Sequence, residues 1–328
     1  MSIHWEPLRK IIDANQSFVL SSHVRPDADA IGSEMGLAGL LEAKGKRVRI
    51  VNPSAIAPRL TFLDPQNRIK KLGEGATAED ILDNDVHIIV DTSAWAQLAD
   101  VGKLFRSTPA TKVVIDHHAR SDDIGAVEFK DETAEATGAL IFHMARALDY
   151  PLTAEIATPL FCAIATDTGW FRFPATSSDT MRTIGDLIDL GAQPNLLYER
   201  LYDQCSIGRV KLAGRVLSRV TVENEGSLAY TWVALDDFAE TGSKPVDTED
   251  LVNECLRIEG TQCAFIAVEQ PNKKVKFSFR SRTGFDVAQI AEQFGGGGHK
   301  QAAGAVLPGT LSATKNQVLA ALRATVSG

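Results

Sequence analysis

The sequence predicts an α/β protein of two domains, and three observations support this prediction. Short apolar runs alternate with helical stretches through the first half of the chain, which is typical of a parallel sheet covered on both faces. After about residue 226, longer strand-like runs alternate with helices. The 328 residues, of which 44% are hydrophobic and 23% charged, are enough for two buried cores.

The elements of the first half follow one another as strand and helix. Predicted strands cover residues 18–22, 47–51, 87–90 and 112–115, and predicted helices cover residues 30–44, 136–148 and 178–190. Gly45 lies where a glycine commonly ends a helix. Residues 159–166 are apolar throughout and fit either a helix or a strand. We expect a doubly wound, mostly parallel sheet with helices on both faces in residues 1–190.

A linker and a second domain are expected after this sheet. Gly191 and Pro194 interrupt the preceding helix, and the following residues have helical character, so we predict a helical linker over residues 191–225. Predicted strands cover residues 228–233, 263–268 and 274–280, with helices at about 248–257, 286–294 and 315–326. These residues, 226–328, should form a smaller α/β domain with a mixed sheet.

The composition excludes several classes of protein. The formal net charge of -8 argues against a sequence-independent binder of long nucleic acid, which usually carries a basic stripe. The four cysteines form no C-x-x-C pair, which indicates reduced thiols and no zinc site. The first residues lack the features of a signal peptide, and no apolar run approaches the ~18 residues of a membrane span. We therefore expect a cytoplasmic protein without membrane contact.

Candidate metal ligands follow four apolar runs of the first half, which we interpret as four strand ends. These candidates are His23, Asp27 and Asp29 after the first run, Asp91 after the second, Asp116, His117 and His118 after the third, and Asp167 after the fourth. A single aspartate after a strand is usually a turn or helix-capping residue. Strand ends of an open parallel sheet line one crevice, however, so all of these side chains can converge there. Clustered acids need compensating cations, which predicts bound metal.

The types of ligand narrow the choice of metal. Carboxylates with imidazoles and no thiolate suit manganese, or magnesium in a site richer in oxygen. Two such cations ~3.5–4 Å apart clamp the attacking and leaving oxygens of a phosphoryl displacement. A hydroxide that bridges both metals would be the nucleophile.

Together, these residues carry a resemblance to a known family. The pattern His23-x-x-Pro-Asp27-x-Asp29, with Asp91, Asp116-His117-His118 and Asp167, resembles the four signature motifs of DHH phosphoesterases. Gly295-Gly-Gly-Gly-His299 resembles the signature of their DHH-associated C-terminal domain. The resemblance covers nearly the whole chain and is strongest to the short, two-domain branch of nanoRNases and pAp phosphatases.

The resemblance implies a role for each site residue. One manganese would be held by His23, Asp27 and Asp91, and the other by Asp29, Asp91, His117 and Asp167. Magnesium or cobalt could replace the manganese ions. His118 would face the scissile phosphate as a donor, and Asp116 would orient a histidine.

The second domain carries candidate substrate-binding residues. Taken alone, the four glycines Gly295, Gly296, Gly297 and Gly298 would be a flexible turn, but they also let a backbone present N–H groups to an anion. His299 follows them, and Arg280 and Arg282 could grip a phosphate. The resemblance implies that this domain reads the distal phosphate and base, while a cleft closes. The candidates for base stacking are Phe171, Phe173, Phe285 and Tyr202.

We therefore expect a manganese-dependent phosphoesterase that degrades short oligoribonucleotides and removes the 3′-phosphate of pAp. Its substrate would be short RNA or a pAp-like nucleotide and never a long duplex, and a homodimer is left open. One alternative is a phosphodiesterase of linear dinucleotides such as pApA. Others are a pyrophosphatase or exopolyphosphatase and, in a different class, a non-catalytic nucleotide sensor. The sensor would require a broken metal motif, whereas every motif is intact.

Overall fold

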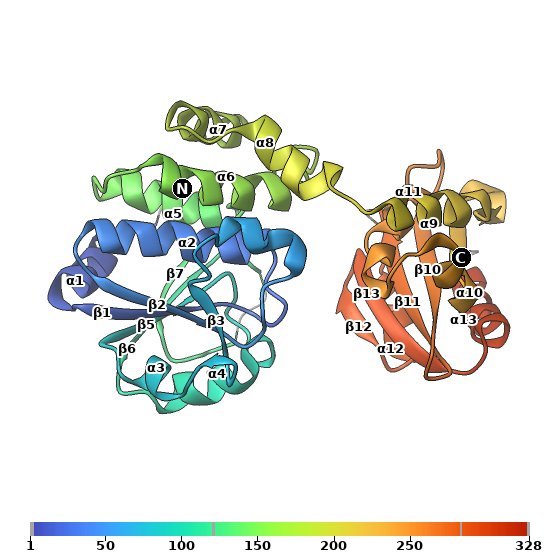
Figure 1. Cartoon of the computed structure of the whole chain (residues 1–328), viewed down its shortest axis with the longest axis horizontal. Coiled ribbons are helices and arrows are strands. Elements are labelled where there is room, and N and C mark those ends of the chain that lie inside the picture. Colours follow the sequence, from blue (N-terminus) through green and yellow to red (C-terminus); the bar gives the residue numbers. More distant parts are fainter. Residues whose placement is uncertain (1–2, 120–121, 283, 327–328) are drawn as a thin grey trace. The chain divides into compact units, whose positions relative to one another are not determined.

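The computed structural model describes residues 3–119, 122–282 and 284–326, without the side chains of His299 and Val326. The chain divides into two compact units, Met1–Asp203 and Gln204–Gly328 (Figure 1). The segment from 191 to 225, for which we predict a linker, thus contributes helices to both units, and its role as a linker stays a prediction. No helix in the described ranges has the length and apolar character needed to cross a membrane.

Unit 1 is built on a seven-stranded sheet with the order β4-β3-β2-β1-β5-β6-β7. Its strands are β1 (Ser17–Ser21), β2 (Arg47–Asn52), β3 (Ile69–Leu72), β4 (Gly75–Ala76), β5 (Val86–Val90), β6 (Thr111–Asp116) and β7 (Val127–Lys130). All neighbouring strands are parallel. The strand order reverses between β1 and β5, and such a switch point is where ligands bind in open α/β sheets.

Helices cover both faces of this sheet (Figure 1). One face carries α2 (Ala28–Ala43), α5 (Thr137–Ala147) and α6 (Ala154–Asp167), and the other carries α3 (Glu79–Leu82) and α4 (Trp95–Ser107). Unit 1 also contains α1 (Glu6–Ala14), η1 (Pro58–Leu63), α7 (Ser178–Asp189), α8 (Pro194–Tyr198) and η2 (Glu199–Asp203). The predicted doubly wound sheet is therefore confirmed, and Gly45 follows α2 with a φ of 75°.

One expectation for unit 1 is wrong. Residues 159–166 belong to helix α6, so Asp167 ends a helix and follows no strand. The helix packs against α2, α5 and α7, and residues from Ile156 to Ala165 are almost all buried. A helix enclosed on most sides shows no polar face, and its apolar run therefore lacks the periodicity that distinguishes it from a buried strand.

Glycines allow α2 and α6 to pack very closely. A Cβ atom at Gly32 would lie 2.3 Å from the Pro159 carbonyl oxygen, and one at Gly36 would lie 2.5 Å from Leu160. Since real side chains do not approach so closely, only glycine fits at these positions. The close contact places the start of α2 and the end of α6 within one rigid layer.

Unit 2 is built on a six-stranded mixed sheet with the order β12-β13-β11-β10-β9-β8. Its strands are β8 (Thr221–Glu223), β9 (Leu228–Val233), β10 (Cys263–Gln270), β11 (Lys274–Ser281), β12 (Gly297–His299) and β13 (Ala302–Pro308). Only the β9–β10 pair is parallel. The helical segments are α9 (Ile207–Ser218), η3 (Asn224–Gly226), α10 (Leu235–Thr241), η4 (Pro245–Thr248), α11 (Leu251–Cys255), α12 (Val287–Gln293) and α13 (Leu311–Val326).

Each face of the second sheet has its own core. Phe265, Phe277 and Phe279 pack with residues of α12 and α13 on one face. Ala264 and Ile266, which alternate with Phe265 along β10, pack with residues of α9 and α11 on the other. The predicted smaller α/β domain with a mixed sheet is confirmed.

Candidate active site

The loop between β1 and α2 supplies the first site residues. His23 holds its Nδ1 3.0 Å from the Val24 carbonyl oxygen. Its Nε2 therefore points to the acids, 3.4 Å from Asp91 Oδ2 and 3.9 Å from Asp27 Oδ1. Asp27 also caps α2, because its carboxylate accepts hydrogen bonds from two backbone amides of the first turn. Asp27 thus caps helix α2 and also lies beside His23.

Asp29 is buried where the N-termini of two helices meet. It lies in the first turn of α2, and its carboxylate oxygens accept hydrogen bonds from the backbone amides of Thr137 and Gly138 at the start of α5. Ser33 Oγ donates a third hydrogen bond, of 3.1 Å. The positive ends of both helices point at this carboxylate and fix its position.

Asp91 stands at the centre of the site. It follows β5 in a left-handed conformation, with a φ of 63°, which a non-glycine residue adopts only where its surroundings hold it. Its side chain is 2% exposed, and Oδ1 accepts a hydrogen bond of 2.9 Å from Thr137 Oγ1. The strained turn at the strand end aims this carboxylate at His23 and His117.

His117 faces three carboxylates with one ring nitrogen. Its Nδ1 lies 3.1 Å from the Ala134 carbonyl oxygen, and a proton there leaves the lone pair of Nε2 available for a cation. Nε2 is 3.7 Å from Asp29, 3.7 Å from Asp91 and 3.5 Å from Asp167. Helix α6 thus brings Asp167 to the same place that a strand would have reached.

The six predicted metal ligands all meet in this structure. Among the residues that the structure describes, three groups have ligand atoms within 4.8 Å of one another: His23, Asp27 and Asp91; Asp29, His117 and Asp167; and Asp91, His117 and His118. Asp91 belongs to two of these groups. The sequence analysis does not predict the group of Asp91, His117 and His118, because it assigns His118 to phosphate contact and not to a metal.

The electrostatics of the cluster favour bound cations. Burial raises the pKa of Asp91 well above its ordinary value, and the charges of Asp29, Asp27 and Asp167 raise it further. Burial, with the charge of Asp29, likewise raises the pKa of Asp167 to about 7. Carboxylates this close need protons or cations. Carboxylate oxygens and two imidazole nitrogens with a free lone pair are ligands that suit a divalent ion of the manganese or magnesium type.

His118 is held by Asp116. Its Nδ1 lies 2.9 Å from Asp116 Oδ1, which also accepts the backbone N–H of His118. Burial raises the pKa of Asp116, but the hydrogen bonds from His118 and from Ser93 Oγ outweigh this effect and keep the pKa below its ordinary value. The hydrogen bond to Asp116 raises the pKa of His118. The histidine that Asp116 contacts is thus His118, which the sequence alone did not decide.

The sequence reasoning missed several side chains that support the site. These are Ser33, Ser93, Thr137 and Lys130, the last with its Nζ buried and 4.0 Å from Asp116 Oδ2. The sequence offered one indication for two of them, their place near a candidate ligand: Ser33 stands one turn after Asp29, and Ser93 stands two residues after Asp91. Their partners come from other strands and helices, which no local pattern reveals.

Of the four glycines of unit 2, Gly297 and Gly298 belong to the edge strand β12, whereas Gly295 lies in the turn that follows α12. Residues 297–299 pair antiparallel with β13 as strand β12. A Cβ atom at Gly296 would lie 2.1 Å from the Gly304 carbonyl oxygen, and one at Gly298 would lie 2.5 Å from that of Ala302. Close approach of two backbones therefore requires these glycines. The side chain of His299 lies outside the described part of the structure.

The two candidate phosphate-binding arginines have backbone partners. Arg282 donates from Nε to the Thr261 carbonyl oxygen at 2.9 Å and from a terminal nitrogen to that of Leu256 at 2.6 Å. Arg280 donates to the carbonyl oxygen of Phe279 at 3.0 Å. Arg282 thus ties the end of β11 to the segment after α11, a structural role that the sequence did not indicate.

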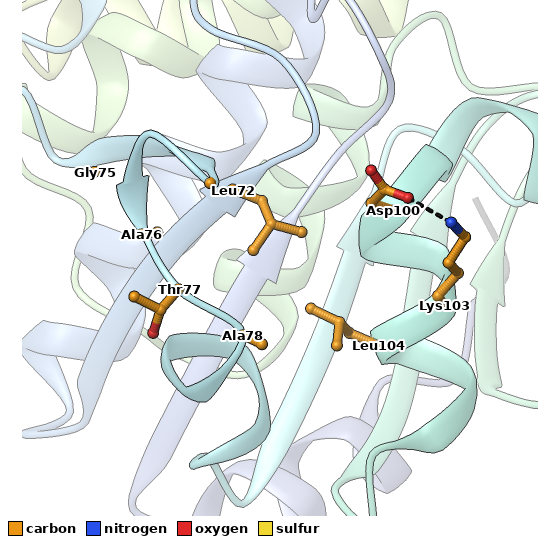
Figure 2. Close-up of a pocket in the computed structure, with 9 residues that line it drawn as sticks. Leu72, Gly75, Ala76, Thr77, Ala78, Asp100, Lys103 and Leu104 are labelled. Carbon is orange, nitrogen blue, oxygen red and sulfur yellow. Dashed lines mark hydrogen bonds and ion pairs between the residues drawn. The ribbon is translucent and has the colours of Figure 1, made fainter.

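A cavity of unit 1 is separate from the cluster. This hollow has a volume of about 630 Å³. Its lining residues come from β3, β4 and the segment before α3 on one side and from α4 on the other (Figure 2). Its wall is mostly apolar, and its charged pair is Asp100 with Lys103, 2.7 Å apart. None of the cluster residues lines it.

Fold and donor set together define a class: α/β proteins with a candidate divalent-metal centre beside the carboxyl ends of a doubly wound sheet. Comparison with family models matches the DHH family, N-terminal domain, over residues 17–164 and the DHHA1 domain over residues 225–328. The bifunctional oligoribonuclease and PAP phosphatase NrnA of Thermus thermophilus is 32% identical, over 98% of this chain and 94% of its own. The chain belongs to the DHH family.

Two further comparisons extend this result. The cyclic-di-AMP phosphodiesterase PdeA of Listeria monocytogenes is 26% identical, and the match covers 97% of this chain and 49% of that protein. The crystal structure of an exopolyphosphatase-related protein from Bacteroides fragilis superposes with a TM-score of 0.92 at 25% identity. That match covers 99% of this chain and 98% of the other.

Proposed function

We propose that this chain is a metal-dependent phosphoesterase that hydrolyses short oligoribonucleotides and the 3′-phosphate of pAp. The observation that carries the proposal is the shared carboxylate of Asp91, which lies in both a group with His23 and a group with His117. A pair of cations sharing one carboxylate is the arrangement that phosphoryl displacement uses. The choice of substrate is supported by the NrnA relative, whose match spans nearly both whole chains.

We assign the metal ligands as two sets that share Asp91. One cation would be held by His23, Asp27 and Asp91, and the other by Asp29, Asp91, His117 and Asp167. Manganese is our first choice, because imidazole ligands accompany the carboxylates. When bound, the cations supply Lewis acidity toward the phosphate and lower the pKa of water.

The chain's own residues then position the proton transfers. His118, whose Nδ1 is hydrogen-bonded to Asp116, would use its other ring nitrogen as a donor toward the phosphate. The charge of Asp116 favours the protonated imidazole that this role requires. Hydrogen bonds donated by Thr137 fix the carboxylates of Asp29 and Asp91 beside His117, so little reorganisation is needed during the reaction.

Unit 2 is the proposed substrate-binding part. Residues 295–298, with His299 and Arg280, remain the candidates for phosphate contact. The N–H groups of Gly295 and Gly296 already donate to carbonyl oxygens at the end of α12, and two backbone carbonyls engage Arg282. We expect His299→Ala to leave the metal content unchanged and to raise KM more than it lowers kcat. Metal loss equal to that of an Asp91 variant would contradict this division of roles. A cytoplasmic location and a homodimer stay predictions.

Linear dinucleotides such as pApA are a second candidate substrate, favoured by the PdeA relative. Purified protein loaded with manganese should be given diribonucleotide, pAp, pApA and inorganic polyphosphate in parallel. We expect mononucleotide from the first and phosphate from the second. Turnover of polyphosphate alone would replace the proposal by an exopolyphosphatase, and nucleotide binding without any turnover would favour the sensor.

A further inference from the structure

The segment after Asp167, residues 168–173, has an unusual backbone; we call it the Asp167 loop. Three consecutive residues are left-handed, with a φ of 58° at Gly169, 58° at Trp170 and 65° at Phe171. Large side chains adopt this conformation only where the surroundings hold them, and such places cluster at ligand sites. The loop therefore has a fixed shape directly beside a metal ligand.

Hydrogen bonds fold the loop back onto the end of α6. The backbone amides of Arg172 and Phe173 both donate to the Thr168 carbonyl oxygen at 3.0 Å, and that of Trp170 donates to Ala165 at 2.6 Å. Thr168 is the residue directly after Asp167. The fold of the loop thus returns the backbone of Phe173 to Thr168, the neighbour of Asp167 in the chain.

The aromatic side chains of the loop differ in their surroundings. The ring of Trp170 contacts those of Phe161 and Tyr198, with centroids 5.9 and 5.0 Å apart, and the Phe171 ring contacts that of Phe161 at 6.3 Å. Phe173, by contrast, is 51% exposed. Two of the three rings therefore anchor the loop in the core, and the third remains accessible.

Gly169 lies against one face of the Phe173 ring. A Cβ atom at Gly169 would be 2.4 Å from Cζ and 2.6 and 2.7 Å from the two Cε atoms. Such similar distances place that position over the ring face and not at its edge. Arg172 donates from Nε to the Gly169 carbonyl oxygen at 2.6 Å, which holds its guanidinium at the same glycine. The Phe173 ring is thus supported on one face by Gly169, and a positive charge is fixed at that glycine.

We propose that Phe173 stacks on the base of the nucleotide whose phosphate lies at the metal cluster. A supported aromatic face accepts any base, because every base has a π-face. The neighbouring guanidinium of Arg172 suits the negative charge of a nucleotide. This inference rests on the proposed function and identifies the base subsite of the same site.

The other three candidates for stacking are less suitable. Phe171 packs on the core of unit 1 and Phe285 on a core of unit 2, so both rings are partly covered. Tyr202 is 46% exposed, but its ring already contacts Trp170 and Tyr198. Exposure together with a supporting surface distinguishes Phe173 from all three.

The test uses the full-length protein with manganese and the variants Phe173→Leu, Phe173→Trp and, as a matched control, Tyr202→Leu. A methylenephosphonate-linked dinucleotide carrying 2-aminopurine reports stacking by fluorescence quenching without turnover. We expect Phe173→Leu to lose most of the quenching and to raise KM for pAp by about ten-fold with kcat little changed. Phe173→Trp and Tyr202→Leu should behave like the wild type.

A base-free substrate separates stacking from a structural effect. Ribose 3′,5′-bisphosphate should have the same KM for the wild type and Phe173→Leu, because it offers nothing to stack. Unchanged quenching in Phe173→Leu, an equal rise of KM on the base-free substrate, or loss of quenching in Tyr202→Leu would each overturn the inference. Because quenching needs no turnover, it tests Phe173 even if the wild type hydrolyses neither nucleotide.

Discussion

At the scale of single residues, Asp91 is the position on which the proposed centre depends most. Its carboxylate is buried, strained in backbone and surrounded by other acids whose charges raise its pKa. Such a residue destabilises the metal-free protein and becomes favourable only with compensating charge. Asp91 therefore serves the proposed metal binding but lowers the stability of the metal-free protein.

We expect Asp91→Ala to bind neither cation and to lose activity by more than about 100-fold, beyond the loss typical of residues outside the coordination shell. Its metal-free form should unfold at the same or a higher temperature than the metal-free wild type, because like-charge repulsion is relieved. Metal analysis, kinetics and thermal unfolding measure these effects. Asp100→Ala, which changes an exposed acid paired with Lys103, is the control and should match the wild type.

A second buried acid, Glu34 of α2, links three elements beside the site. Its Oε2 accepts a hydrogen bond of 2.9 Å from Asn52, whose side-chain oxygen accepts the backbone N–H of Ser22. Burial raises the pKa of Glu34 to about 8, against an ordinary value of 4.5. The folded protein therefore holds a proton on Glu34 at pH values where the unfolded chain has lost it.

The resulting pH dependence has a definite sign. The contribution of Glu34 to stability is fully present below pH 4.5 and is lost as the pH rises to about 8. In this pH range the carboxyl group ionises in the unfolded chain while it stays protonated in the folded state, so the unfolded state is favoured increasingly. We expect Glu34→Gln to remove this loss, so that its melting temperature relative to the wild type rises between pH 5 and pH 8. Each pKa unit corresponds to about 1.4 kcal/mol. Parallel pH dependences of the two proteins would contradict the prediction.

At the scale of elements, the contact between α2 and α6 brings Asp29 and Asp167 together. Gly32 permits this contact, because a side chain there would meet the backbone of Pro159 and the side chain of Ala163. Helix α6 can therefore replace a strand as the carrier of a metal ligand. The two helices must shift apart if the glycine acquires a side chain.

We expect Gly32→Ala to destabilise unit 1 by about 1–3 kcal/mol through overpacking and to weaken metal binding. Gly185→Ala in α7 is the matched control, because a Cβ atom there meets nothing within 4 Å. It should stabilise the protein by about 0.5–1 kcal/mol, since alanine favours a helix over glycine. Denaturant unfolding and metal titration compare the two variants, and equal effects would refute the packing argument.

At the scale of the whole molecule, the candidate metal ligands all belong to one of the two units. Cations should therefore stabilise unit 1 selectively, by about 2.7 kcal/mol at a hundred-fold excess over Kd. Hydrogen exchange with and without manganese should show protection in residues 22–31, 91–93 and 115–118. Protection confined to residues 204–326 would contradict the assignment, and Asp91→Ala should abolish the effect.

The sequence by itself determined the class of fold and identified the residues that meet in the candidate cluster, whose role as metal ligands stays a prediction. Apolar strands followed by acids and histidines are local patterns, and the carboxyl ends of parallel strands must converge. Runs of strand-forming residues likewise located β9, β10 and β11. The strands β3, β4, β7, β8 and β12 escaped prediction, because two to four residues form no periodic pattern. The longer β13 (Ala302–Pro308) escaped it as well.

Only the tertiary structure decided which groups touch. It placed Asp167 on a helix, paired Asp116 with His118, engaged Arg282 with backbone carbonyls and left Phe173 exposed above Gly169. The physical reason is that hydrogen bonds and burial depend on partners far away in the chain, such as Thr137 for Asp29 and Asn52 for Glu34. Local sequence determines where a side chain points relative to its own helix or strand. The packing of helices and strands against one another determines which residue it contacts.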